Sequence, residues 1–202
     1  SRDEHILFGY PSREGEILYR KGYVLSYNTD TKVANWVEYH LTDRYIASGV
    51  KRKDDFRADP DLPKGKRSEL VDYDKSGFDR GHLAPAEDMK RTKKTMSESF
   101  LLSNMAPQKP DFNRGIWKSL EGKARKWVKE RLDIHIITGP LYLDSKASIG
   151  PNRVAVPSHF YKIIVAGSAP DQKLDAIAFI LPNHGNDTAL LPKFITNIDH
   201  IK

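Results

Sequence analysis

Short runs rich in β-branched and aromatic residues recur along this chain, and turn-forming residues separate them. Such runs predict β-strands, because branched and aromatic side chains fit a pleated, partly buried surface. The five runs are Ile17 to Tyr27, Val33 to Ile46, Ile134 to Thr138, His159 to Ala166 and Leu174 to Leu181. The first two flank the turn residues 28–30, which predicts an antiparallel pair. The pattern restricts the chain to folds built on a mainly antiparallel sheet.

One clearly amphipathic helix is expected between two groups of strands. From Asn113 to Arg131, apolar residues recur at helical spacing and fall on one face. They are Ile116, Trp117, Leu120, Ala124, Trp127 and Val128. Asn113 stands where a helix N-cap is expected, and residues 91–102 form a second helical candidate. Because strands outnumber helices, we expect the α+β class, with a mainly antiparallel sheet flanked by helices.

The chain's 202 residues fit a single domain, which we expect to span residues 1–202. The absence of cysteine excludes a disulfide framework, thiolate metal sites and a cysteine nucleophile. No apolar run approaches the roughly 20 residues of a membrane span. The opening SRDEHILFGY is no basic-then-apolar leader, so we expect any targeting segment to lie outside this chain. Residues 51–77 predict a long irregular connection, which in a compact domain is usually functional or mobile.

Positive charge is concentrated in the middle of the chain. The net charge is +6, and residues 51–131 hold 21 Lys and Arg against 14 Asp and Glu, while the flanking segments are close to neutral. A basic segment between neutral flanks is typical of proteins that bind a polyanion. Charge alone is also compatible with a solvated lysine face.

The densest chemical signal is the octapeptide FDRGHLAP, residues 78–85. An isolated histidine in such a turn is most often an ordinary surface residue. Here a second polar stretch, SNMAPQ at residues 103–108, and Asn113 follow it. On the predicted helix, Glu121 and Arg125 fall at one edge of the buried face. They could form an ordinary ion pair, or they could present a carboxylate and a guanidinium along one groove with the Asn113 amide.

Together these motifs resemble the DNA/RNA non-specific endonuclease family, the ββα-metal nucleases that include endonuclease G-like enzymes. The resemblance rests on DRGHLAP and SNMAPQ, and it continues through NRGIW, TGPL and VAVPSHF in the right order and spacing. It covers about residues 23–182, most of the chain. It implies an α+β fold with a ββα-metal motif and an endonuclease that hydrolyses phosphodiester bonds of DNA and RNA.

The resemblance also implies roles for individual residues. His82 matches the general base, Asn113 the only direct protein ligand to the metal, and Glu121 the residue that holds metal-bound water. Arg80 and Arg125 match contacts to the phosphate and the transition state.

Further implied residues are less directly tied to the reaction. Arg52 matches another phosphate-binding arginine, and Lys51 and Lys53 flank it. Asn104 matches an active-site asparagine with a supporting role. The nucleic-acid-binding set is therefore expected to comprise Arg52, Arg80, Arg125 and Lys93.

The chemistry of the reaction agrees with these residue types. A neutral histidine can take a proton from water near neutral pH. Mg²⁺ often keeps several waters and binds only one or two protein oxygens plus phosphate. Arginines supply charge-assisted contacts to developing phosphorane oxygens. We therefore expect Mg²⁺ as cofactor, with Mn²⁺ or another divalent ion as a substitute. The resemblance implies products with 5′-phosphate and 3′-hydroxyl ends. Nothing in this set reads a base, so sequence preference should be weak.

Two other function classes were weighed. A nucleic-acid-binding protein of the same fold without catalysis is disfavoured because His82, Asn113 and Glu121 are all present. A zinc metallohydrolase is disfavoured because the remaining histidines show no HExxH or other short ligand spacing. These are His5, His40, His135, His159, His184 and His200. Most of them are expected to be structural or surface residues.

The resemblance also carries expectations about partners and compartment. Endonuclease G-like proteins are commonly homodimers, and a protein inhibitor is possible. A secreted or periplasmic bacterial protein is the favoured location, with a mitochondrial one as the alternative.

Overall fold

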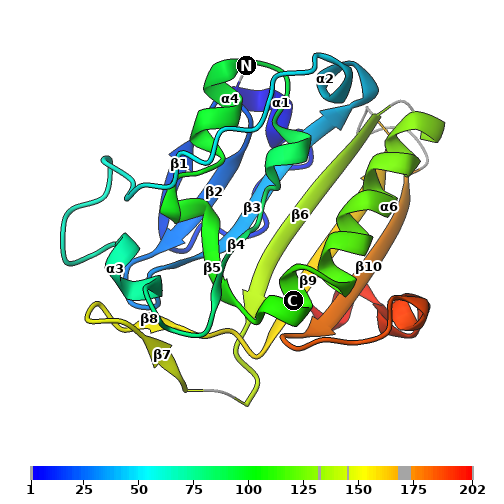
Figure 1. The fold of residues 1–202 in the computed structure, drawn as a ribbon. Helices are drawn as coiled ribbons and strands as arrows, with labels where there is room; N and C mark the ends of the chain where they lie inside the picture. Colours follow the sequence, from blue (N-terminus) through cyan, green and yellow to red (C-terminus); the bar gives the residue numbers. More distant parts are fainter. Residues whose placement is uncertain (1, 132, 145, 168–173, 202) are drawn as a thin grey trace.

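The fold was analysed in a computed structural model, which describes residues 2–131, 133–144, 146–167 and 174–201. A seven-stranded sheet forms its centre, in the order β1-β2-β3-β6-β9-β10-β11, and every neighbouring pair is antiparallel (Figure 1). The strands are β1 (Glu16–Tyr19), β2 (Val24–Asn28), β3 (Val33–Thr42), β6 (Asp133–Leu141), β9 (His159–Ala166), β10 (Asp175–Pro182) and β11 (Ile195–Thr196). This confirms the predicted α+β class.

Two short strand pairs stand apart from the main sheet. They are β4 (Asp79–His82) with β5 (Met105–Gln108), and β7 (Ser148–Ile149) with β8 (Val154–Ala155). The β4–β5 pair lies on the same face of the sheet as the long helix α6 (Ile116–Arg131) (Figure 1). Two strands followed by a helix on one face give the ββα arrangement on which the candidate site is built.

The remaining helices are short. The α-helices are α1 (Arg2–His5), α2 (Asp43–Ala47), α3 (Leu70–Tyr73), α4 (Lys93–Glu98) and α5 (Pro110–Asn113). The 3₁₀ segments are η1 (Ala86–Asp88), η2 (Leu102–Asn104), η3 (Thr188–Phe194) and η4 (Ile198–His200). Among the described residues, no helix is both long enough and apolar enough to cross a bilayer.

The main core lies between the sheet and α6. The predicted stripe on α6 is buried at Ile116, Trp117, Leu120, Ala124 and Val128, and Trp127 packs against it partly exposed. Phe112 and Phe160 stack near Trp117, so α5, α6 and β9 meet in one aromatic cluster. Burial of such side chains contributes roughly 1.5–3 kcal/mol each, which anchors the helix to the sheet.

Three strand boundaries differ from the predicted ones. The run Ile17 to Tyr27 is a hairpin, because Lys21-Gly22 forms a turn between β1 and β2. The run from Val33 leaves the sheet after Thr42, whose hydroxyl accepts a hydrogen bond from the Tyr45 N–H and caps α2.

The strand predicted to end at Thr138 continues through Gly139-Pro140 to Leu141. Pro140 lies past the last residue of β6 that pairs with β3, where a missing N–H is tolerated. The run predicted at His159 to Ala166 matches β9.

Candidate active site

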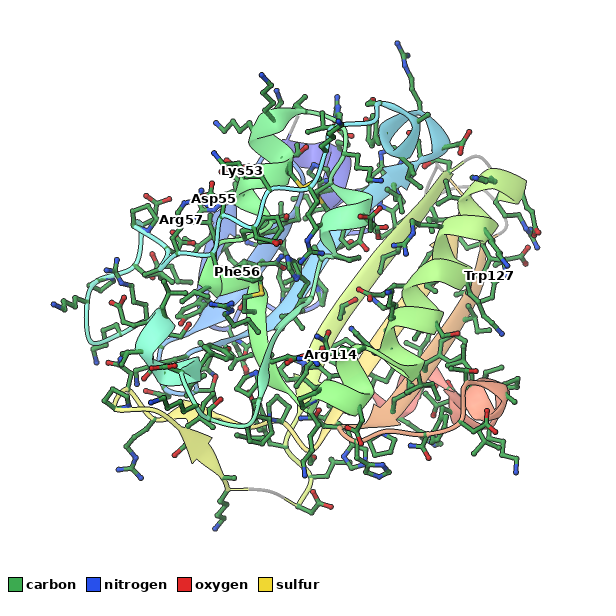
Figure 2. All side chains as sticks on the ribbon, viewed as in Figure 1. Lys53, Asp55, Phe56, Arg57, Arg114 and Trp127 are labelled. Carbon is green, nitrogen blue, oxygen red and sulfur yellow. The ribbon has the colours of Figure 1, made fainter. Side chains whose placement is uncertain are left out.

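Six of the predicted site residues line one pocket of about 330 Å³ between the β4–β5 pair and α6. They are Arg52, Arg80, His82, Asn113, Glu121 and Arg125. Its other lining residues are Phe56, Asp79, Pro85, Ala86, Glu87, Arg114 and Lys118. Phe56 comes from the long connection between α2 and α3 and Arg114 from the turn before α6, both on the face that carries α6 (Figure 2). Residues that are far apart in the sequence therefore share one cavity.

Strand β4 presents two of these residues on the same face. Arg80 and His82 are two residues apart, and side chains at that spacing point to the same side of a strand. Gly81 between them faces Gln108 on β5, and a Cβ at Gly81 would lie 2.2 Å from the Gln108 side chain. The glycine of the DRGH motif therefore leaves room for the Gln108 side chain, which packs against β4 between Arg80 and His82.

His82 is enclosed by aromatic rings and held neutral. Its ring lies 4.9 Å from that of Phe100, edge to face, and 5.8 Å from that of Phe56. Burial, with the Arg52 and Arg80 charges nearby, lowers the pKa of His82 to about 3. The buried Nε2 has no hydrogen-bond partner among the described residues. A neutral imidazole with a free nitrogen can accept a proton once an anionic phosphate offsets the neighbouring arginine charges.

Asn113 does not cap α6, contrary to the prediction. It ends the short helix α5, and the chain turns at Arg114-Gly115 before α6 begins at Ile116. A Cβ at Gly115 would lie 2.4 Å from the carbonyl oxygen of Asp111, so the turn requires glycine. The NRG sequence therefore marks the junction of two helices, which a periodicity argument reads as one helix start.

The junction leaves the Asn113 amide oxygen available. Asn113 Nδ2 donates to Asp79 Oδ2 at 2.9 Å, and the Asp79 carboxylate also accepts two hydrogen bonds from Arg114. A carboxylate only accepts hydrogen bonds, so the amide must turn its nitrogen toward Asp79. Asn113 Oδ1 has no hydrogen-bond donor among the described residues. A neutral oxygen held in this way suits a hard divalent cation.

Arg80 has no carboxylate partner within the described part of the chain. Its guanidinium lies 4.0 Å from the centre of the Phe56 ring, a cation–π contact that orients it without neutralising its charge. Arg52 is more exposed and donates to Asp54. These two arginines therefore give the pocket positive charge for a phosphate.

Arg125 is held by a residue that the sequence reasoning missed. Its Nη1 donates to Asp88 Oδ1 at 2.9 Å, and the buried Asp88 also accepts a hydrogen bond from the Tyr39 hydroxyl of β3. The ion pair spans 37 residues of sequence, so no local spacing reveals it. Asp88 lies three residues after the DRGHLAP segment, and this proximity is a sequence signal that could have pointed to it.

Glu121 lies near a second buried cation that the sequence reasoning missed, Lys162 of β9. Burial raises the pKa of the Glu121 carboxyl, and the nearby Lys162 charge opposes this rise. Burial lowers the pKa of Lys162, whose Nζ donates to Thr138 Oγ1 at 2.6 Å. Helix α6 thus places the Glu121 carboxyl group at the pocket, and the Lys162 ammonium group lies near it.

Two predicted residues lie outside the pocket lining. Asn104 is fully buried, and its amide bonds the backbone of Ala84 and Ser99. It braces the chain after His82. Lys93 is exposed at the start of α4.

The chain was compared with known proteins. The family model for DNA/RNA non-specific endonucleases matches residues 1–202. Nuclease C1 of Cunninghamella echinulata var. echinulata is 45% identical over 199 residues, covering 92% of this chain and 79% of the relative. Mitochondrial endonuclease G of Homo sapiens is 36% identical over 207 residues, covering 96% of this chain and 69% of the relative.

The fold has a close match among solved structures. The crystal structure of an EndoG/EndoGI complex contains a chain that superposes with a TM-score of 0.92 at 35% identity, covering 100% of this chain and 88% of that one. The family model, the sequence relatives and the structural neighbour all indicate the same family. The chain therefore belongs to the DNA/RNA non-specific endonuclease family and is an endonuclease.

Proposed function

We propose that this endonuclease uses Mg²⁺ to hydrolyse phosphodiester bonds of both DNA and RNA, leaving 5′-phosphate and 3′-hydroxyl ends. Mn²⁺ or another divalent ion could replace Mg²⁺. The observation that carries the proposal is the shared pocket, which combines the free nitrogen of His82, the free amide oxygen of Asn113 and guanidinium groups that face them. Nothing in the pocket offers a pattern of groups for reading a base, so we infer weak sequence preference.

The residues present fit a magnesium ion. Asn113 would supply one neutral oxygen, and Glu121 would hold water that surrounds the ion. Mg²⁺ commonly takes few protein ligands and leaves the rest to water and phosphate. When bound, the ion would neutralise phosphate charge and stabilise the departing 3′ oxygen.

His82 would act as the general base. As the water oxygen bonds to phosphorus, a proton passes from the water to the His82 ring, and the bond from phosphorus to the 3′ oxygen breaks. The 3′ oxygen then takes up a proton from solvent water to give the hydroxyl end, and the His82 ring returns its proton to solvent. The low pKa of His82 keeps the base neutral before substrate binds, and the approaching phosphate charge favours the protonated ring afterwards.

Two of the arginines would stabilise the transition state, and the third would mainly bind the phosphate. Arg80 and Arg125 would contact the phosphate oxygens as negative charge develops on them, which lowers the barrier. Arg52 would contribute mainly to binding, because it is exposed and shares its charge with Asp54. Asn104 would support the site through the backbone that follows His82, and Lys93 would add distant phosphate binding.

A catalytically weak nucleic-acid-binding protein of the same fold is the alternative. It is disfavoured because the base, the metal ligand and the carboxylate all line the same cavity. Binding alone would not require a buried histidine with a free nitrogen.

Plasmid nicking tests the proposal. We expect the purified chain to nick supercoiled DNA and to degrade RNA with Mg²⁺, and to stop when EDTA is added. DNA ligase should reseal the nicks, because it requires 5′-phosphate and 3′-hydroxyl ends. His82→Ala protein should still shift the mobility of DNA. Nicking that persists in EDTA, or nicks that ligase cannot seal, would contradict the assignment.

The relatives bear on the compartment and on a protein partner. The human relative is named as mitochondrial, which supports the mitochondrial alternative over the secreted or periplasmic location that we favoured first. A homodimer stays a prediction, as does a single domain over residues 1–202. The EndoG structure in complex with EndoGI supports the expectation of a protein inhibitor.

A further inference from the structure

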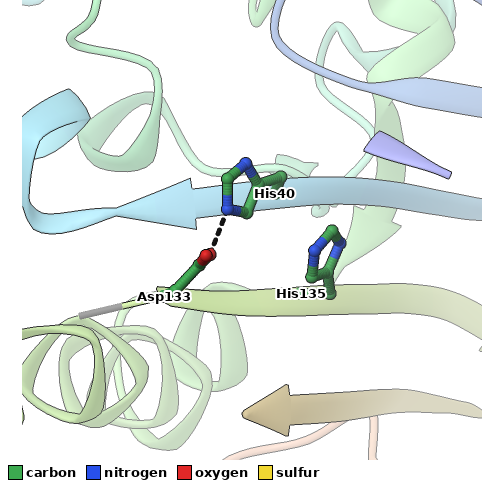
Figure 3. Close-up of side chains that lie close together, drawn as sticks. All are labelled: His40, Asp133 and His135. Carbon is green, nitrogen blue, oxygen red and sulfur yellow. Dashed lines mark hydrogen bonds and ion pairs between the residues drawn. The ribbon is translucent and has the colours of Figure 1, made fainter. Parts of the chain in front are cut away.

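A cluster of metal-binding side chains lies on the sheet, formed by residues that do not line the nuclease pocket. His40 of β3 pairs directly with His135 of β6, and Asp133 is two residues before His135 (Figure 3). Cross-strand partners and residues at a spacing of two share one face of a sheet. The register therefore brings the His40 imidazole next to the Asp133 carboxylate and the His135 imidazole, although His40 is at least 93 residues from both along the chain.

The ligand atoms are close enough to converge on one ion. One nitrogen of each histidine and one Asp133 oxygen all lie within 4.8 Å of one another. The two rings stack at 4.7 Å between centroids, and His40 Nε2 is hydrogen-bonded to Asp133 Oδ1 (Figure 3). Ligand atoms around a tetrahedral zinc ion are about 3.4 Å apart, given bonds near 2.1 Å. Small side-chain rotations would open the hydrogen bond and seat an ion between the three groups.

His135 is buried and, within the described part of the chain, lacks a hydrogen-bond partner at one ring nitrogen, as expected of a metal ligand without its ion. Its side chain is 2% exposed, and its Nδ1 has no hydrogen-bond partner among the described residues. Unpaired buried polar atoms are costly and call for an explanation. His5, on α1 close by, differs, because Nε2 bonds the Lys21 carbonyl and Nδ1 accepts the His40 N–H.

The charge state of the cluster also suits a metal. Burial, with His40 and His5 nearby, lowers the pKa of His135 to about 4, so the ring is neutral at physiological pH. Neutral imidazole and carboxylate are the ligand forms that metals require. Glu4 Oε1 is 3.4 Å from His40 Nδ1, which places a second carboxylate beside the cluster.

We propose that His40, Asp133 and His135 bind one divalent transition-metal ion of the zinc class, separate from the ion held at Asn113. Two imidazoles and one carboxylate favour Zn²⁺, Ni²⁺ or Cu²⁺ over Mg²⁺ and Ca²⁺, which prefer oxygen ligands. The ion would tie β3 to β6 near the point where β3 gives way to α2.

Zinc binding tests the proposal directly. The full chain is stripped with a chelator, dialysed and titrated with Zn²⁺ by calorimetry in the Asn113→Ala background, which removes the catalytic ligand. His40→Gln, His135→Gln and Asp133→Asn are compared in that background. His184→Gln is the matched control, because His184 is exposed and lies outside the cluster.

The expected result is one zinc ion per chain and a higher Tm with zinc. Each cluster variant should bind zinc at least about tenfold more weakly, whereas the His184 variant should match its parent. Asp133→Asn keeps the test decisive if a histidine variant fails to fold, because Asp133 is 25% exposed at the strand start. Less than half an ion bound by the parent, or equal affinity in the Asp133 variant, would overturn the proposal.

Discussion

Asp79→Asn should raise the Mg²⁺ concentration for half-maximal nicking by about tenfold. Asp79 orients the Asn113 amide through a 2.9 Å hydrogen bond and leaves the amide oxygen for the cation. An asparagine at position 79 can offer either a donor or an acceptor, so the Asn113 amide is free to turn its nitrogen toward the metal position.

The magnitude follows from this one hydrogen bond. Hydrogen bonds to charged groups contribute about 1.5–3 kcal/mol, and the Asp79 side chain is 17% exposed, which favours the lower end. A loss of about 1.4 kcal/mol in metal binding corresponds to a factor of ten.

The assay is the initial rate of plasmid nicking over a Mg²⁺ series, with circular dichroism to confirm folding. Arg114→Ala is the matched control, because it removes the other partner of Asp79 while Asn113 keeps its hydrogen bond. Turnover can fall in the control, but half-saturation by Mg²⁺ should not move. A folded Asp79→Asn protein with unchanged Mg²⁺ half-saturation would refute the role of Asp79 in orienting the metal ligand.

Three further predictions test the remaining parts of the site. The His82 ring should stay neutral at pH 5 by NMR, since its pKa in the folded chain is about 3. Because this pKa is below the unfolded value of 6.5, the contribution of His82 to stability is complete above pH 6.5 and declines as the pH falls toward 3. A ring that titrates near 6.5 would disprove the burial argument. Gly81→Ala should lower the unfolding free energy by about 1–3 kcal/mol in urea melts, since the new Cβ would meet the Gln108 side chain at 2.2 Å. An unchanged urea midpoint would disprove the close packing of Gln108 on Gly81. Arg125→Ala should mainly slow nicking, whereas Lys93→Ala should only weaken duplex binding. The Lys93 variant should also reduce the slope of log K against log[salt] by about one unit. An unchanged slope would show that Lys93 is only a solvated surface lysine.

The sequence predicted the elements whose signal is local. The apolar stripe of α6 recurs at helical spacing over many residues, and the run from His159 to Ala166 is rich in branched and aromatic residues and is buried continuously through its middle. The hairpin at Lys21-Gly22 was missed, because two turn residues inside a branched and aromatic run look like a continuous strand.

The site was predicted where motifs carry it and missed where tertiary contacts do. His82 and Asn113 stand in recognisable strings and line the pocket. Asp88 pairs with Arg125 across 37 residues, and the charge of Lys162 on β9 acts on Glu121 of α6, so neither interaction leaves a local pattern. Asn104 stands in a motif yet turns its amide to the backbone, because a motif does not state which way a side chain points.

The most direct test of the central claim is the Mg²⁺ dependence of nicking by wild-type, His82→Ala and Asn113→Ala proteins in one assay. We expect His82→Ala to lower the maximal rate by about 10²–10⁴-fold while the Mg²⁺ concentration for half-maximal rate stays the same. Asn113→Ala should instead move that concentration upward. A His82 variant with more than about a tenth of wild-type turnover, or an Asn113 variant with wild-type Mg²⁺ dependence, would contradict the assignment of base and metal ligand.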